Sequence, residues 1–260
     1  MDLAIICGSG ADELSCLASG RPKRVSTRYG EVDLIEGQIS GTDALILPRH
    51  GLGHAVSPSL INYRAQMAAL RDSGVRTAIG ICAVGSLKAE LRCGRFAVLA
   101  DFIDLTRRRV DTFYGEPGDP VVHTDFTEPY CPRVSNALTQ ACADAGVEYE
   151  SAAVYVGVEG PRYESPAEVR LYASWGADVI GMTNLPEAVL AREAGICYGA
   201  LAIVTNLAAG LSPTPLTHDE VRGVVHASAE KLSEVLERAV SLICHDQGCR
   251  CGARSSPQEK

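Results

Sequence analysis

The alternation of short apolar runs with segments of helical character constrains this fold more than any other feature of the sequence. Apolar runs of strand length occupy residues 3–6, 44–47, 78–81, 96–100, 153–158, 179–182 and 199–204. Helical segments lie at 61–72, 134–145, 166–175 and 186–193, and a long one at 219–242 follows the last run. Nearly continuous apolar strands are typical of a sheet covered on both faces, so the pattern predicts an α/β fold with a central sheet.

Composition excludes several classes of function. The 260 residues are 46% hydrophobic and 22% charged, which suits one large globular domain with a substantial core. The net charge of −8 argues against a nucleic-acid binder that would need a basic face. No apolar run approaches the roughly 18 residues of a membrane span, and the N-terminus does not resemble a secretory signal. We therefore expect a cytoplasmic protein that binds neither nucleic acid nor membrane.

The cysteines fall into two groups. Most of the 10 are single residues in apolar surroundings, where buried thiols are expected in a cytoplasmic protein. Cys244-His245, Cys249 and Cys251 lie together near the C-terminus and could bind zinc, although their spacing is unlike that of common structural sites. We expect a domain over residues 1–243 and a polar, cysteine-containing tail over 244–260.

Helix starts are marked by capping signals. Ser165 and Glu168 have the spacing of a capping box, and the pair Thr217 and Glu220 repeats it. The segment 184–187 is a looser version of the same signal. Residues 107–120 mix charges with Gly and Pro, which indicates a long irregular excursion.

Polar or small residues follow five of the apolar runs directly. They are Gly8-Ser9-Gly10, Arg49-His50-Gly51, the segment Cys82 to Ser86, Thr183, and Thr205-Asn206. In α/β sheets, ligands bind beyond the carboxyl ends of the strands, so these five segments are predicted to converge on one site.

The chemistry of these segments favours an anion site. A guanidinium such as that of Arg49 matches phosphate geometry. The glycines on either side of Ser9 leave backbone N–H groups accessible to an oxyanion. A dinucleotide fingerprint fails because Glu13 stands where its third glycine is required. For Cys82 we favour a packed thiol over a nucleophile, since no neighbouring histidine would activate it.

Together these motifs resemble the trimeric purine nucleoside phosphorylase and methylthioadenosine phosphorylase family over nearly the whole chain. The motifs are Gly8-Ser9-Gly10, Pro48-Arg49-His50-Gly51, Asn62-Tyr63-Arg64-Ala65, Ala83-Val84-Gly85-Ser86-Leu87, the run from Glu159 to Glu164, and the run from Gly181 to Glu187. The resemblance implies the nucleoside phosphorylase type I fold, a single domain with a central mixed, largely parallel sheet flanked by helices. It also implies a homotrimer, or a dimer of trimers, that uses inorganic phosphate as co-substrate and no metal or other cofactor.

The resemblance also assigns roles to individual residues. The residues similar to the phosphate site are Ser9, Arg49, His50, Cys82, Ala83 and Thr183. Met182 resembles the residue that packs on the ribose, Tyr163 the aromatic that lies on the base, and His123 a residue lent by the neighbouring subunit. Cys7 and Cys82 depart from the family pattern, and Cys82 lacks the hydroxyl that is often found there.

The base specificity follows from hydrogen-bond chemistry. A carboxylate at Glu164 accepts from N1–H of a 6-oxopurine, and the Asn206 amide donates to O6 or N7. Adenine-type relatives resemble this chain but carry Ser, Asp and Asp at the positions of Glu164, Asn206 and Ala208. We therefore predict phosphorolysis of inosine, guanosine and their deoxy forms, with Asn206, Glu164 and His50 as catalytic groups.

Two questions stay open at this level. His218, at the first position of a capped helix, favours a 5′-hydroxyl, yet S-methyl-5′-thioinosine or methylthioadenosine remains an alternative substrate. A nucleoside hydrolase and a non-catalytic nucleoside-binding module are alternatives of a different class, which dependence on phosphate would separate. In the tail, Cys249-Arg250-Cys251 resembles a motif that forms a disulfide in some archaeal and thermophilic relatives.

Overall fold

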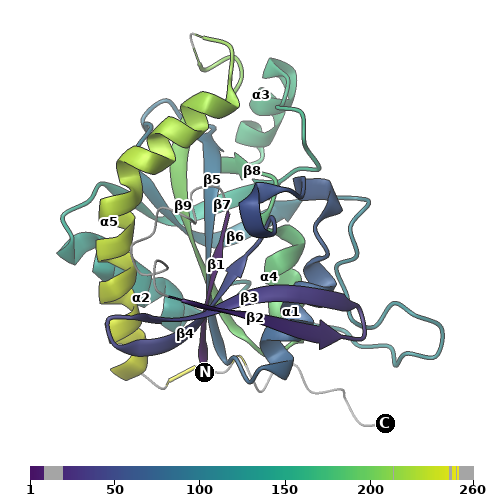
Figure 1. Ribbon diagram of the computed structural model, residues 1–260. Coiled ribbons are helices and arrows are strands. Elements are labelled where there is room, and N and C mark those ends of the chain that lie inside the picture. Colours follow the sequence, from purple (N-terminus) through teal and green to yellow (C-terminus); the bar gives the residue numbers. More distant parts are fainter. Residues whose placement is uncertain (9–19, 213, 246–247, 250, 252–260) are drawn as a thin grey trace.

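The computed structural model describes residues 1–8, 20–212, 214–245, 248, 249 and 251. Over this range the chain forms one mixed sheet with helices on both sides (Figure 1). The strands are β1 (Leu3–Cys7), β2 (Arg21–Thr27), β3 (Gly30–Ile39), β4 (Thr42–Pro48), β5 (Thr77–Ser86), β6 (Phe96–Asp104), β7 (Tyr149–Gly157), β8 (Val179–Gly181) and β9 (Cys197–Leu207). The sequence predicted seven of them; β2 and β3 were missed.

The strand order within the described residues is β2-β3-β4-β1-β5-β8-β7-β6-β9. Strand β1 runs parallel to β4 and β5, and β5 also pairs in parallel with β9. The pairs β2–β3, β3–β4, β5–β8 and β6–β9 are antiparallel. Because β5 pairs with both β8 and β9, the strands β5-β8-β7-β6-β9 close into a ring. The predicted mixed sheet is confirmed, whereas its closure into a ring was not predicted from the sequence.

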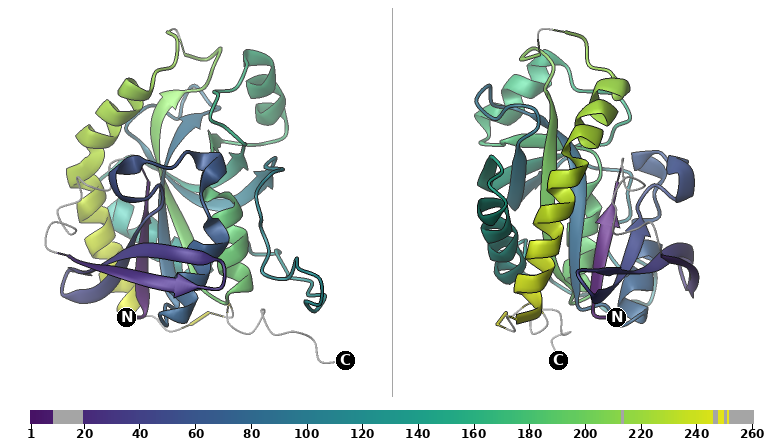
Figure 2. Two further views of the ribbon diagram at one scale, coloured as in Figure 1. Left: turned by 45° about the vertical axis from the view of Figure 1, so that its right-hand side comes forward. Right: turned by 60° about the vertical axis from the view of Figure 1, so that its left-hand side comes forward.

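The helices cover the sheet in two layers. They are α1 (Tyr63–Asp72), α2 (Pro132–Asp144), α3 (Pro166–Ser174), α4 (Asn184–Glu193) and α5 (His218–His245), with short 3₁₀ turns η3 (Leu52–His54) and η4 (Pro58–Leu60). Helices α1 and α4 share one apolar core with the sheet, and α2 and α5 share a second (Figure 2). Within the described residues, no helix is both long and apolar enough to cross a membrane.

Burial explains which strands the sequence revealed. Every residue of β1 is buried, and so are nine of the ten residues of β5, because both strands have helices on each side. Strand β2 ends the described sheet and is mostly exposed, with its Arg24 paired to Asp33 of β3. An edge strand with three basic residues and a proline carries no apolar run, so the hydrophobic pattern could not reveal it.

One capping prediction is confirmed and one is wrong. Ser165 and Glu168 form the predicted reciprocal capping box at the start of α3. At the start of α4, Asn184 instead bonds with its side chain to the hydroxyls of Tyr130 and Tyr198. The other half of that expected cap, Glu187, is fully buried and accepts from Arg49, the residue that follows β4.

Candidate active site

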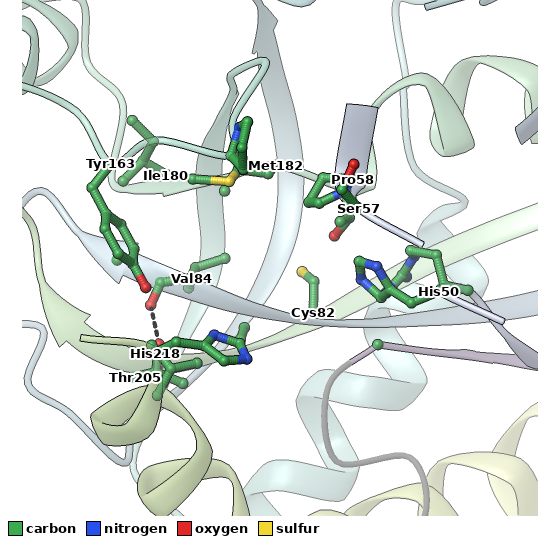
Figure 3. A pocket seen from close by; sticks show the side chains of 18 of the residues that line it. His50, Ser57, Pro58, Cys82, Val84, Tyr163, Ile180, Met182, Thr205 and His218 are labelled. Atoms are coloured by element: carbon green, nitrogen blue, oxygen red, sulfur yellow. Dashed lines mark hydrogen bonds between the residues drawn. The ribbon is translucent and has the colours of Figure 1, made fainter. Parts of the chain in front are cut away.

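A cavity of about 520 Å³ opens at the carboxyl ends of β1, β4, β5 and β9. Its volume suits one small organic ligand. It is lined by Gly8, Arg49, His50, Ala55, Val56, Ser57, Pro58, Cys82, Ala83, Val84, Gly85, Pro161, Tyr163, Glu164, Ile180, Gly181, Met182, Thr183, Thr205, Asn206, His218 and Val221. Figure 3 shows His50 and Tyr163 at opposite ends, with Cys82 between them. The cavity therefore has two chemically different ends, named here the anion end and the base end.

Arg49 forms the floor of the anion end. Its Nε and Nη2 donate to the two carboxylate oxygens of Glu187 at 2.7 and 2.9 Å, and Nη1 donates to the carbonyl of Ile81 at 2.7 Å. Burial lowers the pKa of Arg49, but the charge of Glu187 outweighs it and the net shift is upward. A guanidinium has five N–H donors, and these bonds use three. The other two have no hydrogen-bond partner among the described residues, and Arg49 is one of the residues that line the cavity.

His50 stands beside Arg49, directly after β4. Its Nδ1 lies 2.8 Å from the carbonyl oxygen of Val56. A carbonyl can only accept, so Nδ1 carries a proton and the ring presents Nε2 as its second polar atom. Thr183, the N-cap of α4, adds a hydroxyl to the same cavity.

Cys82 and Ala83 line the wall between the two ends. Burial, partly offset by the charge of Arg49, raises the pKa of Cys82 to about 12. At neutral pH this residue is a thiol and not a nucleophile, as the sequence predicted. Gly8 also lines the cavity. A Cβ at this position would lie only 2.9 Å from Arg49 Nη1, so a larger residue would crowd the guanidinium.

The base end presents a carboxyl group and an amide. Glu164 is 8% exposed and lines the cavity, and burial raises its pKa above the ordinary value. Asn206 lies near the end of β9, where its Oδ1 accepts from the Thr205 hydroxyl at 3.0 Å. Its Nδ2 donates to the carbonyl of Leu207 at 3.1 Å, which uses one of two N–H groups. Thr205 thereby fixes the amide so that a second N–H is available to a ligand.

Arg109 holds the segments that carry the base end. Its side chain is 2% exposed although it belongs to the irregular excursion 107–120. It donates to the carbonyls of Met182, Leu185 and Glu159 at 2.5, 2.7 and 2.7 Å. These bonds join the loop before Tyr163 to the loop that carries Met182. At Gly160, where φ is 63°, a Cβ would overlap the Met182 sulfur, so only glycine allows this approach.

The start of α5 supplies the last wall. His218 lines the cavity from the first turn of this helix, and Glu220 N–H donates to the hydroxyl of Thr217, as half of the predicted capping box. Val221, one turn along, presents an apolar side chain to the same cavity.

The structure brings together most of the predicted site residues. Those that line the cavity are Arg49, His50, Cys82, Ala83, Tyr163, Glu164, Met182, Thr183, Asn206 and His218. Ser9 lies outside the described residues, and so does most of the predicted tail. Ala208 is fully buried behind the wall and does not line the cavity. His123 is exposed and does not line the cavity of its own chain.

Sequence reasoning missed two residues that support the site. Glu187 is the partner of Arg49, and a carboxylate three residues after a helix start was interpreted as a cap. Arg109 lies among three consecutive arginines, and the sequence offers no signal that one of them is buried. A group of four cysteines with the spacing of metal ligands lies elsewhere, at the opposite end of β9.

Comparisons with known proteins agree with this geometry. A family model described as the phosphorylase superfamily matches residues 2–241. The chain is 44% identical over 251 residues to a probable 6-oxopurine nucleoside phosphorylase of Dictyoglomus turgidum, covering 96% of this chain and 95% of that one. It is 41% identical over 255 residues to a probable S-methyl-5′-thioinosine phosphorylase of Methanothermobacter thermautotrophicus, covering 96% and 87%. A solved methylthioadenosine phosphorylase of Schistosoma mansoni with adenine superposes with a TM-score of 0.89 at 32% identity, covering 95% and 93%.

Proposed function

Because the chain belongs to the phosphorylase superfamily, we propose that it cleaves 6-oxopurine nucleosides with inorganic phosphate, giving the free base and a pentose 1-phosphate. The observation that carries the proposal is the arrangement of one cavity with Arg49 and His50 at one end and Glu164 and Asn206 at the other. The first pair suits an oxyanion, and the second pair suits the N1–H and O6 edge of hypoxanthine or guanine.

The chemistry follows from where charge develops. Breaking the glycosidic bond leaves positive charge on the sugar and negative charge on the departing purine. Phosphate held by Arg49, His50 and Thr183 stabilises the sugar cation and then bonds to its anomeric carbon. The second N–H of Asn206 donates to the purine anion at N7 or O6 while Glu164 accepts from N1–H. Positioning and electrostatics supply the acceleration, and no reaction cofactor is required.

The decisive assay compares inosine, guanosine, adenosine, methylthioinosine and methylthioadenosine, each with and without phosphate. We expect turnover of inosine and guanosine that requires phosphate and yields pentose 1-phosphate. Turnover at the same rate without phosphate would instead show a hydrolase. Tight hypoxanthine binding without any turnover would show a binding module.

The base end has its own test. Asn206→Asp should lower the ratio of inosine to adenosine kcat/KM by about 100-fold or more, because a site with buried polar groups rejects the mismatched analogue strongly. Asn206→Ala is the matched control, since it removes the donor without adding an acceptor and should lose inosine activity without gaining adenosine activity. An unchanged ratio in Asn206→Asp would contradict the assignment.

A second candidate substrate is S-methyl-5′-thioinosine. Val221, one turn after His218 in α5, lines the cavity, as does Met182, and both offer apolar side chains to a methylthio group. The relative from Methanothermobacter thermautotrophicus carries this activity in its name. A higher kcat/KM for methylthioinosine than for inosine would select this candidate.

We further propose that the protein works as a cytoplasmic homotrimer, alone or as a dimer of trimers. The exposed position of His123 supports this, since the family resemblance assigns that residue to a neighbouring subunit's substrate. Sedimentation should give a trimer or hexamer mass, and His123→Ala should raise KM for inosine. A fully active monomer would contradict the proposal.

A further inference from the structure

Four cysteines from three separate segments of the chain meet at the end of the sheet opposite the cavity. They are Cys131, Cys197, Cys249 and Cys251, named here the cysteine cluster, and their four sulfurs all lie within 4.8 Å of one another. The sequence pattern alone predicts scattered single thiols at Cys131 and Cys197 and a polar tail that contains Cys249 and Cys251.

Each segment of the cluster is anchored by regular structure. Cys131 is the N-cap of α2, and its N–H donates to the carbonyl of Tyr198 at 2.7 Å. Cys197 is the first residue of β9. Cys249 and Cys251 follow the end of α5, and Cys251 returns into the apolar core with 4% exposure. The cluster therefore joins the segment after α5 to α2 and β9.

The cluster is remote from the reaction. Asn206 comes nine residues after Cys197 along the extended strand β9, which corresponds to about 30 Å. Figure 1 shows α5 running beside β9 from its His218 end at the top of the view to its His245 end at the foot. A ligand in the cluster cannot touch a substrate in the cavity, so its role would be structural.

The spacing of the sulfurs fits a shared metal ion. Two sulfurs bound tetrahedrally to one zinc lie roughly 3.8 Å apart, given zinc–sulfur bonds of about 2.3 Å. The Cys197 and Cys249 sulfurs are 3.1 Å apart, and the limit for all pairs is 4.8 Å. A disulfide requires about 2.05 Å between its two sulfurs. Small side-chain adjustments bring four such sulfurs around one tetrahedral ion.

A cationic side chain lies beside the cluster, because Arg133 follows Cys131 by two residues in the first turn of α2. Arg133 donates to the Ile243 carbonyl at 3.1 Å and to the Thr77 hydroxyl at 2.8 Å, and these bonds hold its charge near the sulfurs.

We propose that the cysteine cluster binds one Zn²⁺ ion, which fastens the segment after α5 to the body of the domain. Four thiolates and Zn²⁺ carry a net charge of −2, which the guanidinium of Arg133 and the N-terminus of α2 partly balance. Each thiol releases its proton as it binds, so metal affinity increases with pH. Thiolate ligands of this kind select zinc and other soft ions over magnesium or calcium.

The first test is the metal content of the full chain purified without oxygen and without chelators. We expect one zinc per chain by mass spectrometry of the elements. Exchange for cobalt(II) should give the visible absorption bands of tetrahedral cobalt bound to sulfur. Cys249→Ser/Cys251→Ser should lose both signals, whereas Cys93→Ser, which alters an exposed cysteine outside the cluster, should retain them.

Measurements of thermal stability and of activity distinguish a structural role of the metal from a catalytic one. Removal of the metal by a chelator should lower the melting temperature and leave kcat for inosine at moderate temperature unchanged. This readout also separates the zinc proposal from the proposed function, since zinc content does not depend on nucleoside turnover.

Two outcomes would overturn the proposal. Mass spectrometry of the oxygen-free protein after thiol alkylation could find the four cysteines joined as disulfides. Alternatively, all four could be reduced and alkylated at the same rate with and without added zinc, with no cobalt spectrum. Because both measurements use the unaltered chain, a variant that fails to fold does not obscure the result.

Discussion

The two ends of the cavity are built on different principles. At the anion end, Arg49 follows directly on a buried strand and is locked by the carboxylate of Glu187, with both side chains fully buried. At the base end only Asn206 belongs to a strand, β9, whereas Tyr163, Glu164 and Met182 come from loops that depend on carbonyl bonds to Arg109. The anion end is thus part of the core, while the base end is attached to it.

This difference teaches where stability and specificity are located. A change at the anion end disturbs the core, so it alters folding together with phosphate binding. A change at the base end moves loops and alters nucleoside binding with a smaller effect on folding. Four changes, taken from the largest expected effect to the smallest, test this division.

Glu187→Ala should have the largest effect. It leaves Arg49 buried without its charge partner, which costs about 3–5 kcal/mol of stability. The double variant Arg49→Met/Glu187→Leu should recover most of that stability but still show a strongly raised KM for phosphate. Thermal melts and phosphate titrations measure the two effects. An unchanged KM for phosphate in the double variant would show that Arg49 does not bind the phosphate.

Arg109→Ala should act mainly on nucleoside binding. A hydrogen bond to a charged group contributes about 1.5–3 kcal/mol, so loss of the loop anchor should raise KM for inosine about 10- to 100-fold. The KM for phosphate should change much less. Arg108→Ala is the matched control, because Arg108 is 72% exposed and approaches Glu159 only at 3.9 Å. Equal changes in both KM values would show that the two ends are not separable.

The pH dependence should report Glu164. Its raised pKa means that it takes up a proton at a higher pH than an ordinary glutamate, and the protonated form cannot accept N1–H. The kcat/KM for inosine should therefore fall towards acid pH, about tenfold per unit below that pKa. Glu164→Gln should lose this limb and keep any limb due to the ionisation of phosphate. Identical profiles would contradict the role of Glu164.

His218→Val should have the smallest effect. Loss of one hydrogen bond to a 5′-hydroxyl costs about 0.5–1.5 kcal/mol, which corresponds to about a 2- to 10-fold loss of inosine kcat/KM. Methylthioinosine should lose less, since valine packs against its methylthio group. A larger loss for methylthioinosine would move the assignment to the second candidate substrate.

The same division explains what the sequence could predict. Arg49, His50 and Cys82 follow apolar strands, and strand ends of one sheet must meet, so their convergence was predictable from pattern alone. The residues that pair with these side chains could not be predicted in the same way. Glu187 has the spacing of a helix cap, and only the three-dimensional approach of β4 and α4 shows that it neutralises Arg49.

Loops gave the weaker predictions for a physical reason. A side chain in irregular backbone has no periodicity that reveals which way it points, so Arg109 looked the same as Arg107 and Arg108. Glu164 and Tyr163 were placed through the resemblance, together with the chemistry of the purine edge. The cysteine cluster escaped prediction for another reason: Cys131, Cys197 and the pair Cys249 and Cys251 are far apart in the sequence, and only the fold brings them together.

The polar strand β2 affects how the protein behaves when it is concentrated. A strand at the border of a sheet offers unpaired backbone groups to any strand that meets it, which is a common start of aggregation. Here that strand carries Arg21, Lys23 and Arg24, and Pro22 lacks an N–H donor. A second molecule that docked edge to edge would bring its cations against these. The basic residues that leave β2 without an apolar run thus also disfavour edge-to-edge pairing of separate molecules into fibrils.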